Sequence, residues 1–554
     1  MSIRLLARTI ALVPCLILVS GWAAVATAKA ESDVPLYKGL GDHHREVTTS
    51  SPLAQRCFDQ GFTWAYAFNH DEAIRSFEKA AQLDPDCAMA WWGVALCNGP
   101  HINNPAVAPE RAAAAWQALQ KAMAARAHAT PVERALIEAL SKRYVDSAPT
   151  DRSALDKAYA DAMAEVWEEH PQDPDVGTLY AEALMDLRPW DLWTQDQQPR
   201  PETPVIVAVL EEVLRLDPKH PGANHLYIHT VEPSRHPEKA NAAAERLRDL
   251  VPGSGHLVHM PSHIYVLTGR WADAAQQNEL AISADRAYRT IAPRQGFYHV
   301  YMLHNHHMLA FASMMEGRRE VAVRAAREVV ESVPEDYKKR EAALVDPYMG
   351  AIYDVLKRFG RWDDILKEPA PPSYLPITTA MWRMNRGVAY AAKGDIVLAA
   401  QERVAFQKAA SQVPEGSLMA INPAADILKI AEYFLDGEIS YRRGDIDVSV
   451  RALRQAIALE DRLRYMEPPE WMQPVRHTLG AVLMSAGRFE EAEKVYREDL
   501  ADWPENGWSL YGLSRCLEER GAGAEAKEVE ERFGKAWSRA DAPIASSCLC
   551  VPRT

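Results

Sequence analysis

The sequence lacks the short motifs by which many enzyme classes are recognised. It contains no H-E-x-x-H zinc-protease pair, no G-x-S-x-G nucleophile elbow, no G-x-x-x-x-G-K-S/T phosphate loop and no G-x-G-x-x-G before a helix. It also shows no alternation of strand and helix patterns of the βαβ type. Nothing in these patterns marks a nucleophile, so any chemistry must come from residues that the fold brings together.

An excess of positive charge is also absent. The 554 residues carry a net charge of −14, whereas nucleic acids and anionic membranes attract basic surfaces. We therefore expect neither as a partner. The acidity favours solubility and says nothing about a substrate.

Long apolar runs are missing as well. The run from Ile10 to Val19 is shorter than the roughly 20 residues that span a bilayer. Arg4 and Arg8 precede this run, and Ala28-Lys29-Ala30 follows it with small residues. We interpret residues 1–30 as a secretory signal cleaved after Ala30, with a single-pass anchor as the alternative. The predicted location is the periplasm or cell envelope, with no membrane span after signal removal.

Cysteine is scarce, with seven in the chain and six after the predicted cleavage. Cys548-Leu549-Cys550 lies in a predicted tail over 541–554 and could be redox-active, metal-binding or disordered; we expect disorder. Residues 31–53 have no helical period and are interpreted as a lead-in segment, in which we expect His43 and His44 to be solvated.

A 34-residue period begins at Ala54. Small and large residues recur at fixed positions of this unit in the first repeat, at Gly61, Trp64, Ala73, Phe77, Ala80 and Pro85. The pattern resembles the tetratricopeptide repeat. It implies an all-α fold over residues 54–540, a single right-handed α-solenoid of antiparallel helix pairs in which each repeat packs only on its neighbours around a concave groove. Insertions are predicted near 99–110, 188–204 and 286–302, and the Trp-rich second one either caps the groove or forms a surface loop.

Histidine is concentrated in one part of this array. Of the 18 histidines, 11 lie between His220 and His307. The spacing from His225 to His259 is 34 residues, as is that from His229 to His263. Residues separated by the repeat length occupy equivalent places in successive helix pairs, so we expect these side chains to converge.

The convergence is predicted to form a metal site in repeats 221–311. In proteins that resemble this repeat, positions 2, 5 and 9 of the first helix line the groove, and seven of the nine such positions here are histidine. The predicted ligands are His225, His229, His256, His259, His263, His304 and His307. A metal-free polar pocket for an anion or peptide, and simple packing, are the alternatives. For His220, His236, His299 and His306 we expect packing.

An all-imidazole ligand set favours copper or zinc; iron is possible, although it usually takes carboxylate ligands as well. Seven imidazoles exceed the four ligands of a closed zinc site and could hold two ions. Outer partners could be Glu232, Tyr227, Tyr265 and Asn305. Pro261 is expected to start or kink its helix, which would bend the histidine stripe.

The segments NHLYIHTVEPSRHPEKA, GHLVHMPSHIYVLTGRW, LHNHHMLAFASMMEGR and EALMDLRPWDLW together resemble a family of exported bacterial repeat proteins. The resemblance covers most of residues 55–330 and implies a solenoid and export, but no activity. The sequence therefore supports two hypotheses. One is a metal-binding solenoid acting as a metal-dependent oxidoreductase, a hydrolase or a metal carrier. The other is a metal-free scaffold that binds a small molecule, a peptide or an envelope protein.

Overall fold

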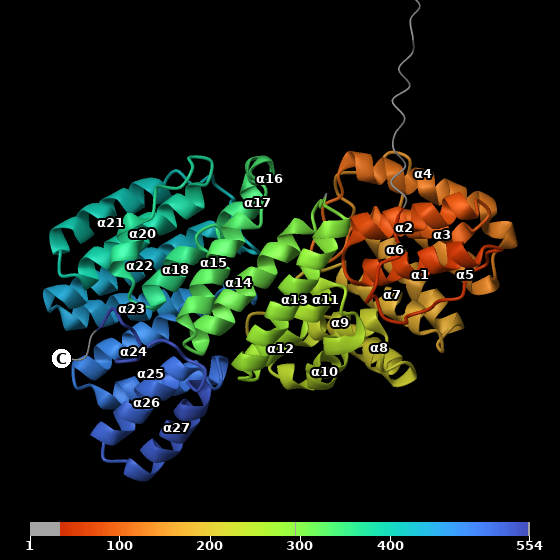
Figure 1. The fold of residues 1–554 in the computed structure, drawn as a ribbon. Helices are drawn as coiled ribbons and strands as arrows, with labels where there is room; N and C mark the ends of the chain where they lie inside the picture. The colour runs from red at the N-terminus through yellow and green to blue at the C-terminus, as the bar shows by residue number, and fades with distance from the viewer. Residues whose placement is uncertain (1–33, 294, 552–554) are drawn as a thin grey trace, which may run out of the picture. The chain divides into compact units, whose positions relative to one another are not determined.

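The computed structural model describes residues 34–293 and 295–551 (Figure 1). The architecture below is that of the compact unit that begins at Leu36. The predicted signal segment lies outside the described residues. Within the described ranges, no helix is both long and apolar enough to cross a membrane.

The fold is all-α and consists of sequential antiparallel helix pairs, which confirms the predicted fold class. Consecutive helices lie side by side along the chain (Figure 1). The first group comprises α1 (Pro52–Tyr66), α2 (His70–Leu83), α3 (Ala88–Cys97), α4 (Pro109–Ala125), the 3₁₀ helix η1 (Arg126–His128), α5 (Pro131–Leu140), α6 (Ser153–Glu169), α7 (Pro174–Met185) and α8 (Thr203–Leu216).

The second group carries the histidine-rich repeats. It comprises α9 (Pro221–Val231), η2 (Pro237–Ala240), α10 (Asn241–Leu250), α11 (Gly255–His259), α12 (Pro261–Leu267), α13 (Trp271–Ile291), α14 (His299–Met315), α15 (Arg319–Glu331), α16 (Glu335–Arg340), α17 (Ala342–Val345), η3 (Asp346–Tyr348), α18 (Ala351–Arg358) and α19 (Trp362–Lys367).

The third group contains a short antiparallel hairpin of β1 and β2, in which Leu418 pairs with Pro423 and Met419 with Asn422. Its elements are α20 (Pro376–Ala392), α21 (Ile396–Ala410), β1 (Leu418–Met419), β2 (Asn422–Pro423), α22 (Ala424–Arg443), α23 (Ile446–Glu460), α24 (Val475–Ser485), α25 (Phe489–Asp502), α26 (Gly507–Glu519) and α27 (Gly523–Ala536). One large apolar core runs mainly through α1 to α18, and a second runs through α20 to α27.

Glycine explains both the turns and the close packing of the pairs. Gly487, in the turn between α24 and α25, has a φ of 69°, a left-handed conformation that other residues adopt at a cost. Within α24, a Cβ on Gly480 would lie 2.4 Å from the ring of Tyr496. The small residue therefore lets two helices of a repeat touch, as the period predicts.

The helices of the second histidine repeat differ from a regular pair in two predicted ways. A helix break at Met260 separates α11 from α12, and Pro261 is the first residue of α12. The following helix, α13, runs for 21 residues and ends at Ile291, so it extends into the predicted insertion near 286–302. Both features confirm the sequence interpretation, and the break places His256 and His259 on a short helix ahead of His263.

The expectation that each repeat packs only on its neighbours is wrong. Trp271 in α13 donates its indole N–H to the carbonyl of Pro504 at 2.8 Å, and Trp508 in α26 donates to the carbonyl of Met314 at 2.8 Å. The C-terminal repeats thus contact the histidine-rich repeats directly. Such contacts can enclose residues that an open groove would expose.

The lead-in segment also belongs to the fold. The Arg45 guanidinium pairs with Asp173 at 2.8 Å and with Asp175 at 3.1 Å. His43 contacts the Asp175 carboxylate at 3.1 Å and is largely buried, whereas the side chain of His44 is 56% exposed. The expectation of solvation therefore holds for His44 and is wrong for His43.

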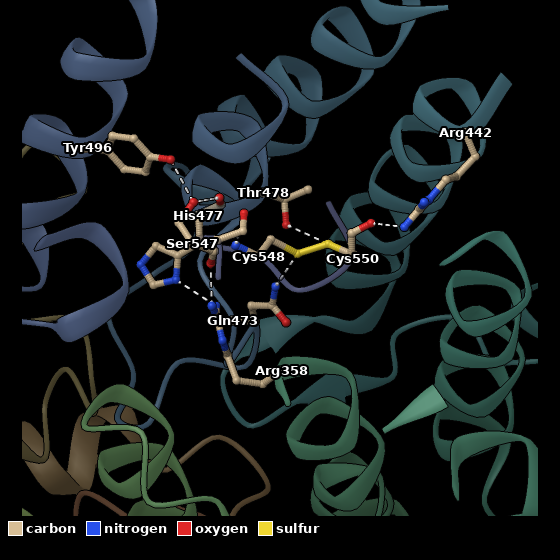
Figure 2. The surroundings of a disulfide bond; sticks show 10 residues. Arg358, Arg442, Gln473, His477, Thr478, Tyr496, Ser547, Cys548 and Cys550 are labelled. Atoms are coloured by element: carbon tan, nitrogen blue, oxygen red, sulfur yellow. Dashed lines mark hydrogen bonds between the residues drawn. A yellow bond between two sulfur atoms is a disulfide. The ribbon is translucent and has the colours of Figure 1, made fainter. Parts of the chain in front are cut away.

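The segment around Cys548 and Cys550 is ordered and buried, which corrects the expectation of disorder. The two cysteines form a disulfide, and Figure 2 shows the residues around it. The Ser547 hydroxyl donates to the carbonyl of His477 at 2.8 Å, while Arg358 and Arg442 donate to the carbonyls of Ser547 and Cys550. Because these carbonyls are acceptors for arginines of α18 and α22, the segment ties two repeats together.

Candidate metal centre

Six of the seven predicted histidine ligands meet in one buried cluster. They come from four helices, with His225 and His229 on α9, His256 and His259 on α11, His263 on α12 and His304 on α14. All six are at most 9% exposed. The break at Met260 does not separate them, since His259 and His263 still face each other. We call these six residues the imidazole cluster.

One half of the cluster is the triad His259, His263 and His304. Its ligand nitrogens lie within 4.8 Å of one another. The Nε2 atoms of His259 and His263 are 2.7 Å apart, and the rings of His259 and His304 have centroids 4.6 Å apart. Three imidazoles at this spacing could ligate one ion.

The other half is the triad His225, His229 and His256, whose ligand nitrogens also lie within 4.8 Å of one another. His225 Nε2 and His256 Nε2 are 3.1 Å apart. The ring centroids of His229 and His263 are 5.5 Å apart, so the two triads adjoin. The cluster therefore has donors for two neighbouring ions.

Glu232 connects the two triads through its carboxylate. Its Oε1 accepts from His229 Nδ1 at 2.8 Å and its Oε2 accepts from His263 Nδ1 at 2.7 Å. Burial alone would raise the pKa of Glu232, but His263 and His229 lower it to about 2. The carboxylate is thus an anion that holds both rings with Nδ1 protonated and Nε2 free. This is the orientation that a second-shell carboxylate gives to metal-ligating histidines.

The ring of His259 is fixed in the same sense. His259 Nδ1 lies 2.7 Å from Asn278 Oδ1, and the Asn278 amide nitrogen donates to the carbonyl of Ala274 at 2.8 Å. Because the second bond fixes which end of the amide faces the ring, His259 Nδ1 must donate. Its Nε2 therefore carries a lone pair.

Two lone pairs consequently face each other at 2.7 Å, those of His259 Nε2 and His263 Nε2. A hydrogen bond between them would need one more proton. Burial lowers the pKa of both imidazoles, and Glu232 offsets only part of this effect at His263. An added proton is therefore disfavoured, whereas a cation ligated by both nitrogens would remove the repulsion between their lone pairs.

The contact between His225 and His256 can form as an ordinary hydrogen bond without an added cation. His225 Nδ1 donates to the carbonyl of Tyr66 at 2.7 Å, whereas His256 Nδ1 has no partner among the described residues. His256 can therefore carry its proton on Nε2 and donate it to His225. Of the two triads, that of His259, His263 and His304 is therefore the better candidate to hold an ion.

A third group, formed by His43, Asp175 and His220, satisfies its hydrogen bonds without a metal ion. The backbone N–H of Ala223 donates to His220 Nδ1 at 3.0 Å, so the ring proton is on Nε2 and is donated to Asp175 at 3.0 Å. No lone pairs oppose each other in this arrangement. We interpret it as a structural hydrogen-bond network, which agrees with the packing role expected for His220.

Sequence reasoning missed two residues that complete the centre, Tyr465 and Glu467. Glu467 Oε1 lies 3.3 Å from His263 Nδ1. Burial, reinforced by the nearby Glu232 anion, raises the pKa of Glu467 well above its usual range. Burial and the same two carboxyl groups also raise the pKa of Tyr465. The centre thus contains protonated oxygen donors beside the imidazoles.

Both residues lie in the long segment 461–474 between α23 and α24. Helix connections in compact repeats are usually shorter. The unusual length of this segment was therefore the sequence signal that could have indicated a functional role for Tyr465 and Glu467.

The imidazole cluster opens onto a cavity of about 790 Å³. His229, His256, His263 and His304 contribute to its wall. Most of the remaining wall is apolar or aromatic, including Trp190, Phe297, Tyr301, Tyr348 and Ile421. A ligand of the imidazoles would thus face a space suited to a small molecule with an apolar body.

The Trp-rich insertion caps this region, which selects between the two interpretations that the sequence left open. The Trp190 ring lies edge-on to His229 with centroids 5.3 Å apart, and the Trp193 indole donates to the carbonyl of Thr230 at 2.7 Å. Arg464, from the segment 461–474, donates to the carbonyl of Trp190. A second cavity, of about 920 Å³, lies along this cap and includes His229 and Glu232 in its wall.

The remaining predicted residues lie elsewhere. His307 Nε2 contacts Met472 Sδ at 3.1 Å and belongs to neither triad. The Tyr227 hydroxyl donates to Glu211, and the Tyr265 hydroxyl donates to Glu245. The Asn305 amide donates to Asp285. Of the four predicted outer partners, the structure thus brings Glu232 to the histidines and engages the polar groups of the other three with different residues.

The sequence matches no family model and no curated protein. Similar solved structures include the Cut9–Hcn1 hetero-tetramer of the APC/C, with 13% identity over 84% of this chain and 76% of that chain and a TM-score of 0.30. They also include the human IFIT1 dimer with m7Gppp-AAAA, with 13% identity, coverage of 88% and 91% and a TM-score of 0.32. The human IFIT1 dimer with PPP-AAAA has 14% identity, coverage of 86% and 88% and a TM-score of 0.33. Because these identities and TM-scores are low, the fold assignment rests on the helix pairs described above.

Proposed function

We propose that this chain is an exported solenoid protein that binds a copper or zinc ion through the imidazole cluster. The observation that carries the proposal is the 2.7 Å contact between His259 Nε2 and His263 Nε2, both of which are lone-pair donors. His304 supplies the third imidazole. Neutral imidazoles are the ligands that zinc and copper share, and iron would need a carboxylate such as that of Glu467 to join the set.

A second ion could occupy the triad of His225, His229 and His256. The carboxylate of Glu232 is an anion that accepts a hydrogen bond from one histidine of each triad, His229 and His263. This charge offsets part of the cost of burying divalent cations. We therefore propose one ion in the triad of His259, His263 and His304, and a second ion in the other triad when the cluster is fully occupied.

The exposure of the cluster to the 790 Å³ cavity favours an enzyme over a storage site. Structural zinc sites are closed by four protein ligands, whereas catalytic sites keep a position open for water or substrate. A bound ion would activate water or a substrate oxygen there. Glu467, held in its protonated form, lies beside His263 and could donate a proton to a reacting group. We therefore propose a metal-dependent hydrolase or oxidoreductase that acts on a small, largely apolar molecule.

The test of metal binding compares two histidines that are both buried. In His263→Ala, zinc and copper affinity should fall by more than the roughly 10- to 100-fold that loss of an outer partner costs. In the control His306→Ala, affinity should be unchanged, because His306 lies on α14 away from the cluster and pairs with Glu328 at 3.1 Å. Elemental analysis and isothermal titration of each variant measure occupancy and affinity, and circular dichroism checks the fold.

Equal affinity in His263→Ala and wild type would contradict the proposal. So would a wild-type protein that takes up neither zinc nor copper after treatment with a chelator. In that case a metal-free scaffold that holds a peptide or envelope protein would become the better explanation, and peptide binding in the presence of chelator would test it.

A further inference from the structure

A smaller cavity shares part of its wall with the 790 Å³ cavity and is lined by several methionine side chains. Its volume is about 20 Å³, enough for one water-sized occupant. Four thioethers and one imidazole contribute to its wall, from Met381, Met419, Met466, Met472 and His307. These residues come from α20, β1, the segment 461–474 and α14. We call this space the methionine pocket.

His307 is the polar group that packing alone does not explain. It is 7% exposed, and burial lowers its pKa to about 4, so the ring is neutral. Its Nε2 faces Met472 Sδ at 3.1 Å, and its Nδ1 has no hydrogen-bond partner within the described ranges. A neutral imidazole has one donor and one acceptor nitrogen. In either tautomer, at least one of them is left with a weak sulfur contact or no partner, a costly arrangement in a buried site.

The carboxyl groups on the same wall are already engaged. Asp354 pairs with the Lys357 ammonium at 2.9 Å, and Glu470 accepts from the Asn422 amide at 2.8 Å. Burial raises the pKa of Glu470 to about 7. The remaining side-chain donors on this wall are the thioether sulfurs, the imidazole nitrogen and the neutral hydroxyl of Tyr348.

Thioethers and imidazole together discriminate among metal ions. Thioether sulfur is a soft ligand that selects Cu(I), whereas Mg²⁺ and Ca²⁺ prefer oxygen. None of these donors is an anion, so they suit a monovalent ion better than a divalent one, because burying a single charge costs less. Methionine also fills gaps in ordinary cores, but a core would not need a buried imidazole facing the sulfurs.

We propose that the methionine pocket binds one Cu(I) ion through His307 Nε2 and the thioether of Met472, with Met381, Met419 and Met466 as the remaining soft donors. This site is separate from the imidazole cluster and does not depend on its function. Its donors differ from the six clustered imidazoles, although Tyr348 and Met466 line both this pocket and the larger cavity.

The test uses Ag(I), which is monovalent, soft and inert to oxidation, on protein labelled with ¹³C in its methionine methyl groups. Zinc is added first so that any imidazole site is occupied. One equivalent of Ag(I) should shift the methyl signals of Met381, Met419, Met466 and Met472. Cu(I) affinity is then measured by competition with a chromophoric Cu(I) chelator, under anaerobic conditions.

Methionine-to-leucine substitutions remove sulfur while nearly conserving volume. Met472→Leu and Met381→Leu should each weaken Cu(I) binding at least about tenfold, by loss of a ligand of the kind that selects this ion. The matched control is Met384→Leu, since Met384 is fully buried on the same helix as Met381 and does not line the pocket. His307→Ala should weaken binding as strongly as Met472→Leu.

The proposal is overturned if Ag(I) leaves all four methyl signals unmoved, or if Met472→Leu and Met384→Leu bind Cu(I) equally. Failure of the zinc experiment would not affect this result, because the methyl shifts report only on sulfur. Conversely, a metal-binding imidazole cluster would remain if the methionine pocket stayed empty.

Discussion

Glu232→Ala is expected to lower metal affinity by about 10- to 100-fold and to destabilise the protein by about 1 to 3 kcal/mol for each N–H group that it leaves without an acceptor. Both effects have one cause. The carboxylate accepts from His229 Nδ1 and His263 Nδ1, so its loss leaves two buried N–H groups without an acceptor and frees both rings to rotate. Isothermal titration gives the affinity, and urea unfolding of the metal-free protein gives the free energy of unfolding.

Glu238→Ala is the matched control. Glu238 also pairs with a histidine, His236, at 3.0 Å, but both side chains are more than half exposed. Exposed pairs contribute about 0 to 1 kcal/mol, so this variant should bind metal and unfold like the wild type. If Glu232→Ala behaved like Glu238→Ala in both measurements, the carboxylate would have no role in the centre. Glu232→Gln should lie between the two, because the amide retains one acceptor.

Metal affinity is expected to change little between pH 7.5 and pH 5.5. Metal ions compete with protons for histidine, and a site of ordinary histidines loses affinity below their usual pKa of about 6.5. Burial, reinforced by His263 and His259 respectively, lowers the pKa of His259 and His304 well below that value. Burial also lowers the pKa of His263. Their neutral forms therefore persist as the pH falls through 6.5, and competition from protons begins only at lower pH.

The size of this effect makes it measurable. For three ordinary imidazole ligands with a pKa of about 6.5, the neutral fraction of each would fall about 5.5-fold between pH 6.5 and 5.5, so affinity would fall by roughly 170-fold. Zinc affinity of this protein should fall by less than tenfold over the same interval. A histidine peptide with exposed rings, titrated in the same buffers, provides the reference. A parallel decline in protein and peptide would show that the ligands are ordinary exposed histidines.

The repeat period predicted much of this centre. Because His225 and His259, and His229 and His263, are one period apart, their helices present them to the same space, and the structure brings them together. The period also places His304 in register despite the insertion before it. The period does not predict which way the side chains between the ligands point. Tyr227 lies two residues from His225, and two residues correspond to about 200° around a helix, so its hydroxyl turns away to Glu211.

The remaining contacts of the centre could not be derived from the repeat, because no period encodes them. Glu467 reaches His263 from a segment between distant repeats, and Trp190 reaches His229 from an insertion. His307 occupies a predicted groove position yet meets Met472 of that same distant segment. A solenoid whose repeats contacted only their neighbours would have left these positions open to solvent.

The contacts between the segment 461–474 and the histidine-rich helices restrict how this chain can change length. Repeat arrays can gain or lose whole units by recombination when each unit meets only the next. Here, deletion of one helix pair between α15 and α23 would shift the register of every later unit and carry Glu467 and Met472 away from α12 and α14. We expect such a deletion to abolish the methionine pocket and to remove Glu467 from the imidazole cluster, while leaving each remaining helix pair able to form.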